Sequence, residues 1–115
     1  MKNYEAWQKQ HEAKAGLMTS CASAVRQTVA DAEVILYGSV ARGEETADSD
    51  VDLLVLVPQP VTPVLRRAIR AQLYHIGLQA DRVITSIVRQ KSAWHSAPLN
   101  YTPLYQAIEN EGVRL

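Results

Sequence analysis

Two aspartates, Asp50 and Asp52, lead directly into the apolar run Leu53–Val57, and this junction constrains the fold more than any other part of the chain. The run contains only leucine and valine, so it predicts a buried strand over residues 50–57. Because side chains alternate along a strand, the two carboxylates share one face, with Cα atoms about 7 Å apart. Like charges at this distance repel unless a cation neutralises them. The junction therefore favours a divalent-ion site that holds Mg²⁺ or Mn²⁺.

A second feature, the pair Gly38-Ser39, precedes Asp50 by a gap of ten residues and follows a short β-branched and aromatic segment over residues 33–37. Glycine tolerates a tight turn, and Ser39 can cap a short helix that ends at Arg42. Backbone amides at such a turn and helix start bind phosphate groups. The spacing therefore predicts a phosphate-binding turn ahead of metal-binding carboxylates, which indicates metal-dependent chemistry on a nucleotide.

Two other loops that bind phosphate or an ion can be tested against the same residues. A P-loop is excluded because Glu44 and Glu45 stand where that motif requires lysine and serine or threonine. A calcium EF-hand is excluded because Leu53 replaces its turn glycine and Gln59 replaces its bidentate glutamate.

Size and composition narrow the classes of function. The chain has 115 residues, of which 47% are hydrophobic, so it fits one domain with a real core but no second substrate domain. Its formal net charge is zero, which argues against generic nucleic-acid binding. Cys21 is the single cysteine, and no apolar window approaches a signal peptide or membrane span. We therefore expect a cytoplasmic protein without a membrane contact.

The remaining periodicity predicts helices and one further strand. The expected elements are a helix over residues 3–30 with a candidate break at Gly16, a helix from Thr62-Pro63 that Gly77 stops, a strand over residues 81–88 that Asp81 opens, and a last helix from Thr102-Pro103 to Glu111. Alternating helices and strands predict an α/β (α+β) domain with a small mixed sheet packed against helices. Residues 1–115 form this single domain, with a helical segment over residues 1–31 and a catalytic core over residues 32–115.

Three stretches of the sequence resemble the minimal nucleotidyltransferases of the nucleotidyltransferase superfamily, which has a polymerase beta-like fold. They are LYGSVARGE at residues 36–44, DSDVDLLV at residues 48–55 and ENEGV at residues 109–113. The resemblance covers about residues 34–115, and the N-terminal helical part is less diagnostic.

The resemblance implies roles for six residues. Asp50 and Asp52 would hold two Mg²⁺ ions, roughly 3.5–4 Å apart, that stabilise the attacking oxygen and the pyrophosphate leaving group, with Mn²⁺ as a substitute. The family has a third carboxylate on a neighbouring strand, and Asp81 is our candidate for that ligand and for assisting deprotonation of the acceptor. Gly38, Ser39 and Arg42 would bind the nucleotide, although Arg42 is equally suited to bracing the loop by ion pairs with nearby acidic residues.

The resemblance also implies an activity and a partner. The activity is transfer of a nucleoside monophosphate, AMP from ATP in the first instance, to a hydroxyl group. The acceptor would be a tyrosine of a separate HEPN-domain toxin, for which this chain would be the antitoxin. One alternative is nucleotidylation of a small molecule such as an aminoglycoside, in which a homodimer could supply the missing substrate wall. The other is a binding module that neutralises its partner without catalysis.

The other candidate residues have ordinary structural interpretations. His11, His75 and His95 lack the spacing of zinc ligands. Cys21 is expected in the core, and Trp7 and Trp94 are expected to fill either the core or a partner interface.

Overall fold

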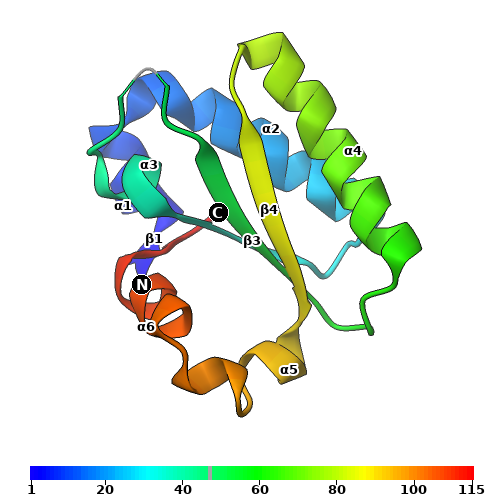
Figure 1. Ribbon diagram of the computed structural model, residues 1–115. Helices are drawn as coiled ribbons and strands as arrows, with labels where there is room; N and C mark the ends of the chain where they lie inside the picture. Colours follow the sequence, from blue (N-terminus) through cyan, green and yellow to red (C-terminus); the bar gives the residue numbers. More distant parts are fainter. Residues whose placement is uncertain (47) are drawn as a thin grey trace.

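A mixed β-sheet of five strands forms the centre of the domain in the computed structural model, which describes residues 1–46 and 48–115 (Figure 1). The strands are β1 (Lys2–Asn3), β2 (Glu33–Tyr37), β3 (Val51–Val57), β4 (Ile84–Gln90) and β5 (Val113–Arg114). Their order across the sheet is β1-β5-β2-β3-β4. β3 lies antiparallel to β2 and parallel to β4, and the two terminal strands β1 and β5 pair in parallel. The predicted mixed sheet is confirmed.

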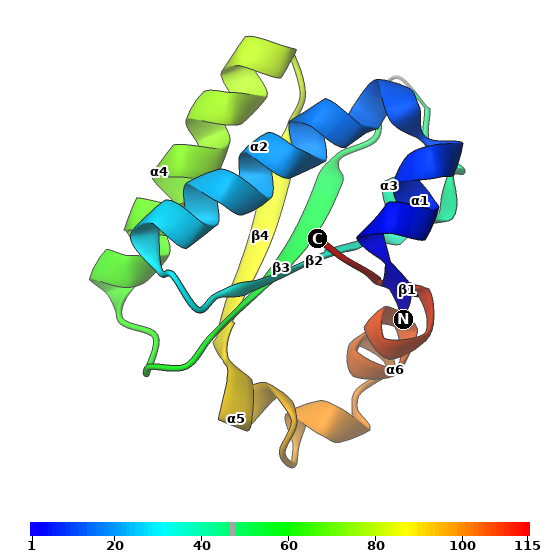
Figure 2. The same cartoon turned by 180° about the vertical axis from the view of Figure 1, so that it is seen from behind.

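Helices cover both faces of this sheet. They are α1 (Tyr4–Gln10), α2 (Glu12–Thr28), α3 (Gly38–Arg42), α4 (Pro63–Ala80), α5 (Lys91–Trp94) and α6 (Pro103–Glu111), with a 3-10 turn at Leu99–Tyr101. The long helices α2 and α4 lie side by side across one face, as the front and back views show (Figures 1 and 2). The short helices α5 and α6 pack near the opposite face. None of the helices in the described residues is long and apolar enough to cross a bilayer.

The apolar run of β3 contributes to two separate hydrophobic clusters, one on each face. Leu53, Val55 and Val57 pack in the cluster that includes residues of α2 and α4, whereas Leu54 and Leu56 pack in the cluster that includes Trp94 and Ile108. A strand that is buried on both faces needs apolar residues at every position rather than at alternate ones. This two-sided burial explains why the sequence after Asp52 is continuously apolar.

The predicted helix starts and core residues agree with the structure. Thr62 Oγ1 accepts a hydrogen bond from the Leu65 amide at 3.1 Å, and Thr102 Oγ1 accepts one from the Tyr105 amide at 3.2 Å. Both N-caps are followed by proline at the first helical position. Trp7, Trp94 and Cys21 are buried in the core, as predicted, and burial raises the pKa of the Cys21 thiol to about 11.

Other boundaries were predicted wrongly. The N-terminal helical region is divided at His11, the N-cap of α2, rather than at Gly16. Gly77 does not stop α4, which continues to Ala80. The glycine instead makes room for the Arg82 carbonyl, since a Cβ at position 77 would lie 2.5 Å from that oxygen. α3 begins at Gly38, so Ser39 is inside the helix and is not its cap.

Candidate active site

Asp52 lies inside the regular part of the sheet, where its neighbours are fixed by strand register. It pairs with Tyr37 of β2 on one side and with Thr85 of β4 on the other. The Thr85 hydroxyl donates a hydrogen bond of 2.7 Å to Asp52 Oδ1. A hydrogen bond to an ionised acceptor is stronger than one between neutral groups and holds the carboxylate in one orientation. One oxygen of Asp52 is therefore positioned by the edge strand.

The other oxygen of Asp52 faces the turn that begins α3. Gly38 has φ of 78°, in the left-handed region that favours glycine. A Cβ at this position would lie 2.4 Å from Asp52 Oδ2, which is closer than non-bonded atoms approach. The left-handed backbone agrees with the tight turn predicted at Gly38, while its role in phosphate binding stays a prediction. The turn backbone and the carboxylate are in direct contact, so a group bound at one meets the other.

Tyr37 connects this carboxylate to the core on the opposite face from α2 and α4. Its side chain packs against the cluster that contains Trp94 and Ile108. Burial, followed by the negative charge of Asp52, raises the pKa of the Tyr37 hydroxyl. Tyr37 therefore remains protonated near neutral pH and places an uncharged side chain beside Asp52.

Asp50 is placed differently, because β3 begins one residue after it. Asp50 is exposed, and it lines a pocket of about 240 Å³ together with Asp48, Asp81 and Arg82, among others. The neighbouring backbone is tied to the α4–β4 turn, where the Val51 amide donates to the Val83 carbonyl at 2.9 Å. That Asp50 and Asp52 lie on one face of the sheet stays a prediction, because Asp50 precedes Val51, the first residue of β3 that pairs with β4.

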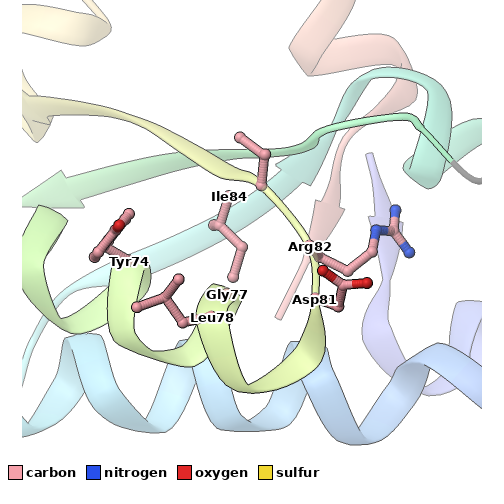
Figure 3. A pocket seen from close by; sticks show the side chains of 7 residues that line it. Tyr74, Gly77, Leu78, Asp81, Arg82 and Ile84 are labelled. Carbon is pink, nitrogen blue, oxygen red and sulfur yellow. The ribbon is translucent and has the colours of Figure 1, made fainter.

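Asp81 does not open a strand, contrary to the prediction. It is the C-cap of α4, with a left-handed backbone at φ of 54°, and β4 begins only at Ile84. Figure 3 shows Asp81 beside Arg82 at this turn. Within residues 1–46 and 48–115, no group of three His, Cys, Asp or Glu side chains could hold a metal ion. The structure thus does not gather Asp50, Asp52 and Asp81 into one cluster, and the metal-ligand role of Asp81 stays a prediction.

Arg42 extends from the end of α3 and forms ion pairs with two glutamates. Its Nε donates to Glu44 Oε2 and its Nη1 donates to Glu111 Oε2, each at 3.0 Å. The bond to Glu44, then that to Glu111, raises the pKa of the Arg42 guanidinium. These ion pairs agree with the second interpretation of Arg42 from the sequence, in which it braces the loop; its partners are Glu44 and Glu111. The nucleotide-contacting role of Arg42 stays a prediction.

The N-terminal helices support α3 and therefore the Gly38 turn. The Trp7 indole Nε1 donates to the Ala41 carbonyl at 3.2 Å, and its ring stacks on His11 with centroids 4.6 Å apart. His11 in turn lies against Gly43, where a Cβ would approach His11 Cε1 to 2.9 Å. The N-terminal helical segment is thus part of the wall behind the site.

The loop between α3 and β3 is anchored by charged side chains from two other elements. Arg82 Nη2 donates to the Ser49 carbonyl at 3.0 Å and pairs with Glu45 Oε2 at 3.4 Å. Glu45 Oε1 forms a second ion pair with Lys14 of α2. Sequence reasoning missed Arg82 and Thr85, because their roles depend on pairing between segments distant in sequence. The alternation of residues 81–88 did place Thr85 on a definite face, but only the β3–β4 register brings it to Asp52.

The donor set near Asp50 and Asp52 fits magnesium. Mg²⁺ in nucleotide sites is typically bound by one or two carboxylates plus substrate phosphates and waters, and a cage made entirely of protein ligands is not required. Asp52 presents one oxygen at the Gly38 turn, where a phosphate could reach it, and Asp50 stands at the adjacent strand end. Two carboxylates without a third protein ligand therefore match an ion that arrives with a nucleotide.

Comparison with known proteins identifies the family. The profile of a family described as Nucleotidyltransferase domain matches residues 18–111. One relative, "Putative protein adenylyltransferase MJ0141" of Methanocaldococcus jannaschii, is 33% identical over 82 residues, which cover 71% of this chain and 76% of the relative.

Two crystal structures share the fold. The first is a toxin-antitoxin with AMP-PNP, with a TM-score of 0.62 and 20% identity. The second is a mutant of the toxin-antitoxin MntA-HpeT, with a TM-score of 0.61 and 18% identity. In each case the match covers 84% of this chain and 69% of the other. At these identities the likeness supports the fold, whereas the family rests on the profile and on the relative. The chain therefore belongs to the nucleotidyltransferase domain family and is a nucleotidyltransferase.

Proposed function

We propose that this nucleotidyltransferase transfers AMP from ATP to a hydroxyl group of a partner protein, and that the acceptor is a tyrosine of a HEPN-domain toxin that the chain neutralises. The observation that carries the chemistry is the contact between Asp52 and the Gly38 turn, with Thr85 orienting the carboxylate. The protein acceptor is supported by the relative named as a protein adenylyltransferase. The toxin partner and the nucleotide are supported by the structural neighbour that is a toxin-antitoxin with AMP-PNP.

In the proposed reaction the acceptor oxygen attacks the α-phosphorus of ATP. A new oxygen–phosphorus bond forms, the bond from that phosphorus to the β-phosphate oxygen breaks, and pyrophosphate leaves. The acceptor proton passes to a nearby carboxylate or to water. Asp50 and Asp52, together with the phosphates, would hold Mg²⁺, and the bound ion would supply charge neutralisation for the attacking and leaving oxygens.

The chain's own residues bind and orient the nucleotide in this proposal. Gly38 lets backbone amides approach the phosphates because it carries no side chain between them and Asp52. Ser39 adds a hydroxyl and an amide within the first turn of α3. Thr85 keeps one Asp52 oxygen engaged, so the other is directed toward the Gly38 turn. Reactants held in this way avoid much of the entropic cost of the bimolecular step.

The test is transfer of label from α-labelled ATP with Mg²⁺ to the candidate HEPN-domain protein. We expect label on the partner with the wild-type chain. Removal of a residue that hydrogen-bonds to a metal ligand typically lowers activity by roughly 10–100-fold. Asp50→Asn and Asp52→Asn remove the proposed ligands themselves, so each should lower activity by more than this. Asp31→Asn is the matched control, because Asp31 is an exposed aspartate before β2, outside the site.

Each outcome of this experiment has a defined meaning. Absence of label with correctly folded wild-type chain would refute transfer to that partner. Label on an aminoglycoside without any protein present would move the acceptor to the small-molecule class. If Asp50→Asn and Asp52→Asn still neutralise the partner at full strength, neutralisation does not depend on catalysis.

A further inference from the structure

Two other elements contact the loop that carries Asp50, and the charged contacts they make with it are not explained by core packing. Lys14 comes from α2, Glu45 and Ser49 belong to the loop, and Arg82 comes from the turn between α4 and β4. The Glu45 side chain is only 9% exposed and the Arg82 side chain 20% exposed. Ion pairs screened from water in this way are stronger than those on an open surface.

The place of Arg82 is itself fixed by backbone geometry. Its amide donates to the Gly77 carbonyl at 2.9 Å, and the preceding Asp81 adopts a left-handed conformation that ends α4. Gly77 has no Cβ, which allows the Arg82 carbonyl to lie against the helix. Figure 3 shows the Arg82 side chain extending away from Tyr74 and Leu78. The turn therefore directs the guanidinium toward the loop rather than toward solvent.

The contact made by Arg82 lies one residue from Asp50. The guanidinium donates to the Ser49 carbonyl, and the Val51 amide on the other side of Asp50 is bonded to the Val83 carbonyl. Asp50 is thus held between two bonds to the same turn. Arg82 also lines the pocket that contains Asp48, Asp50 and Asp81.

We propose that Arg82 is a positioning residue for the metal site: by binding the Ser49 carbonyl and Glu45, it fixes the loop so that Asp50 is held ready for the ion. This inference rests on the proposed function, because it assigns Asp50 to metal binding. In this proposal Arg82 acts through the loop rather than by binding the nucleotide or the acceptor. Partners that orient a ligand in this way typically change metal affinity or activity by about 10–100-fold when they are removed.

Two measurements without nucleotide test the proposal directly. The first is Mn²⁺ affinity from the paramagnetic signal of the free ion. The second is amide hydrogen exchange in peptides that contain Glu44–Thr46 and Asp48–Asp50. Arg82→Ala should weaken Mn²⁺ binding by about 10-fold or more and speed exchange in these peptides. Arg82→Lys should recover part of both, because lysine can still donate to the Ser49 carbonyl or to Glu45. Arg67→Ala is the matched control, since Arg67 is an exposed arginine on α4.

A third readout is the kinetics of nucleotidyl transfer. Arg82→Ala should lower kcat more than it raises KM for ATP, since the Gly38 turn is untouched. Glu45→Gln keeps the contact between Arg82 and the Ser49 carbonyl and weakens only the ion pairs, so it should lower kcat less than Arg82→Ala does. This variant replaces Arg82→Ala in the test if Arg82→Ala folds poorly.

The outcomes separate this proposal from the proposed function. Unchanged Mn²⁺ affinity and unchanged exchange in folded Arg82→Ala would overturn the positioning role, whatever the activity of the wild type. If the wild type binds no Mn²⁺ and transfers no nucleotide, the proposed function fails, and the positioning role, which is defined by that metal site, falls with it. Faster exchange with wild-type Mn²⁺ affinity would show that Arg82 is only structural and would also overturn the proposal.

Discussion

Asp50 and Asp52 are two residues apart in the sequence, yet the structure holds them by different means. Asp52 is fixed by the sheet: its neighbours are set by strand register, Thr85 holds one oxygen, and Gly38 meets the other. Asp50 stands before the ladder, and charged side chains that bind its loop hold its surroundings in place. Backbone ladders are little affected by salt or by one surface mutation, whereas ion pairs are affected by both. The two carboxylates should therefore respond to different perturbations.

The strongest way to break the Asp52 side of this comparison is Gly38→Ala. The added Cβ would meet Asp52 Oδ2 at 2.4 Å, and alanine would also be strained at φ of 78°. Displacement of the carboxylate or the turn by about 1 Å should lower kcat/KM of nucleotidyl transfer by about 100-fold. The backbone strain should cost about 1–3 kcal/mol of unfolding free energy, measured by urea denaturation.

Gly16→Ala is the control for this substitution. Gly16 lies within α2, and a Cβ there would meet no atom within 4 Å. Alanine in a helix interior should therefore stabilise the protein by up to about 1 kcal/mol and leave activity unchanged. Activity of Gly38→Ala within a few-fold of the wild type would show that the close approach to Asp52 is not needed.

A smaller effect is expected from Thr85→Val, which preserves the shape of the side chain but removes the hydroxyl. Asp52 Oδ1 then loses its donor. A hydrogen bond to a charged group contributes about 1.5–3 kcal/mol, and the lower end of this range, which we expect here, corresponds to a fall in kcat of about 10-fold. Steady-state kinetics should show a smaller change in KM for ATP. Thr85→Ser keeps the hydroxyl and should stay near the wild type; equal activity of the valine and serine variants would contradict an orienting role.

Salt should distinguish the two carboxylates without any mutation. An increase from about 0.1 M to about 1 M NaCl shortens the Debye length from about 10 Å to about 3 Å. Amide exchange in the Asp50 loop should then rise by at most about five-fold, the upper range for exposed ion pairs, because Glu45 and Arg82 are partly shielded from the salt, while exchange in β3 stays constant. Arg82→Ala should remove most of this salt response. An equal response in β3 and in the loop would mean that salt acts on global stability instead.

The difference between Asp52 and Asp50 also explains which parts of the structure could be predicted from the sequence. Asp52, Gly38 and β3 carry local signals, namely fixed spacing and a continuous apolar run. The predicted strand and the tight turn at Gly38 agree with the structure, whereas the metal-binding role of Asp52 and the nucleotide-binding role of Gly38 stay predictions. The terminal strands β1 and β5 span two residues each, too short for any periodicity. They form through pairing between segments distant in sequence, β1 with β5 and β5 with β2.

The errors near Asp50 have a common cause, which is tertiary contact. Local propensity alone predicts that Gly77 ends the helix, but it lies inside α4, where the lack of a Cβ leaves room for the Arg82 carbonyl. The alternation of residues 81–88 predicts a strand that begins at Asp81, yet Asp81 takes a left-handed conformation as the C-cap of α4. Both residues build the turn that presents Arg82, so the part of the site that depends on this turn could not be read from sequence.

The smallest expected effect tests the wall behind the Gly38 turn. Burial, then the charges of Lys14 and Lys2, lower the pKa of His11. An unfolded chain therefore binds more protons than the folded one between the lowered pKa and about 6.5, so the contribution of neutral His11 to stability is complete above about pH 6.5 and is lost as pH falls through the folded-state pKa. Urea denaturation should show a shallow loss of stability on this side of neutrality. His11→Gln should reduce this slope, because glutamine does not titrate; an identical slope in both proteins would assign it to the carboxylates instead.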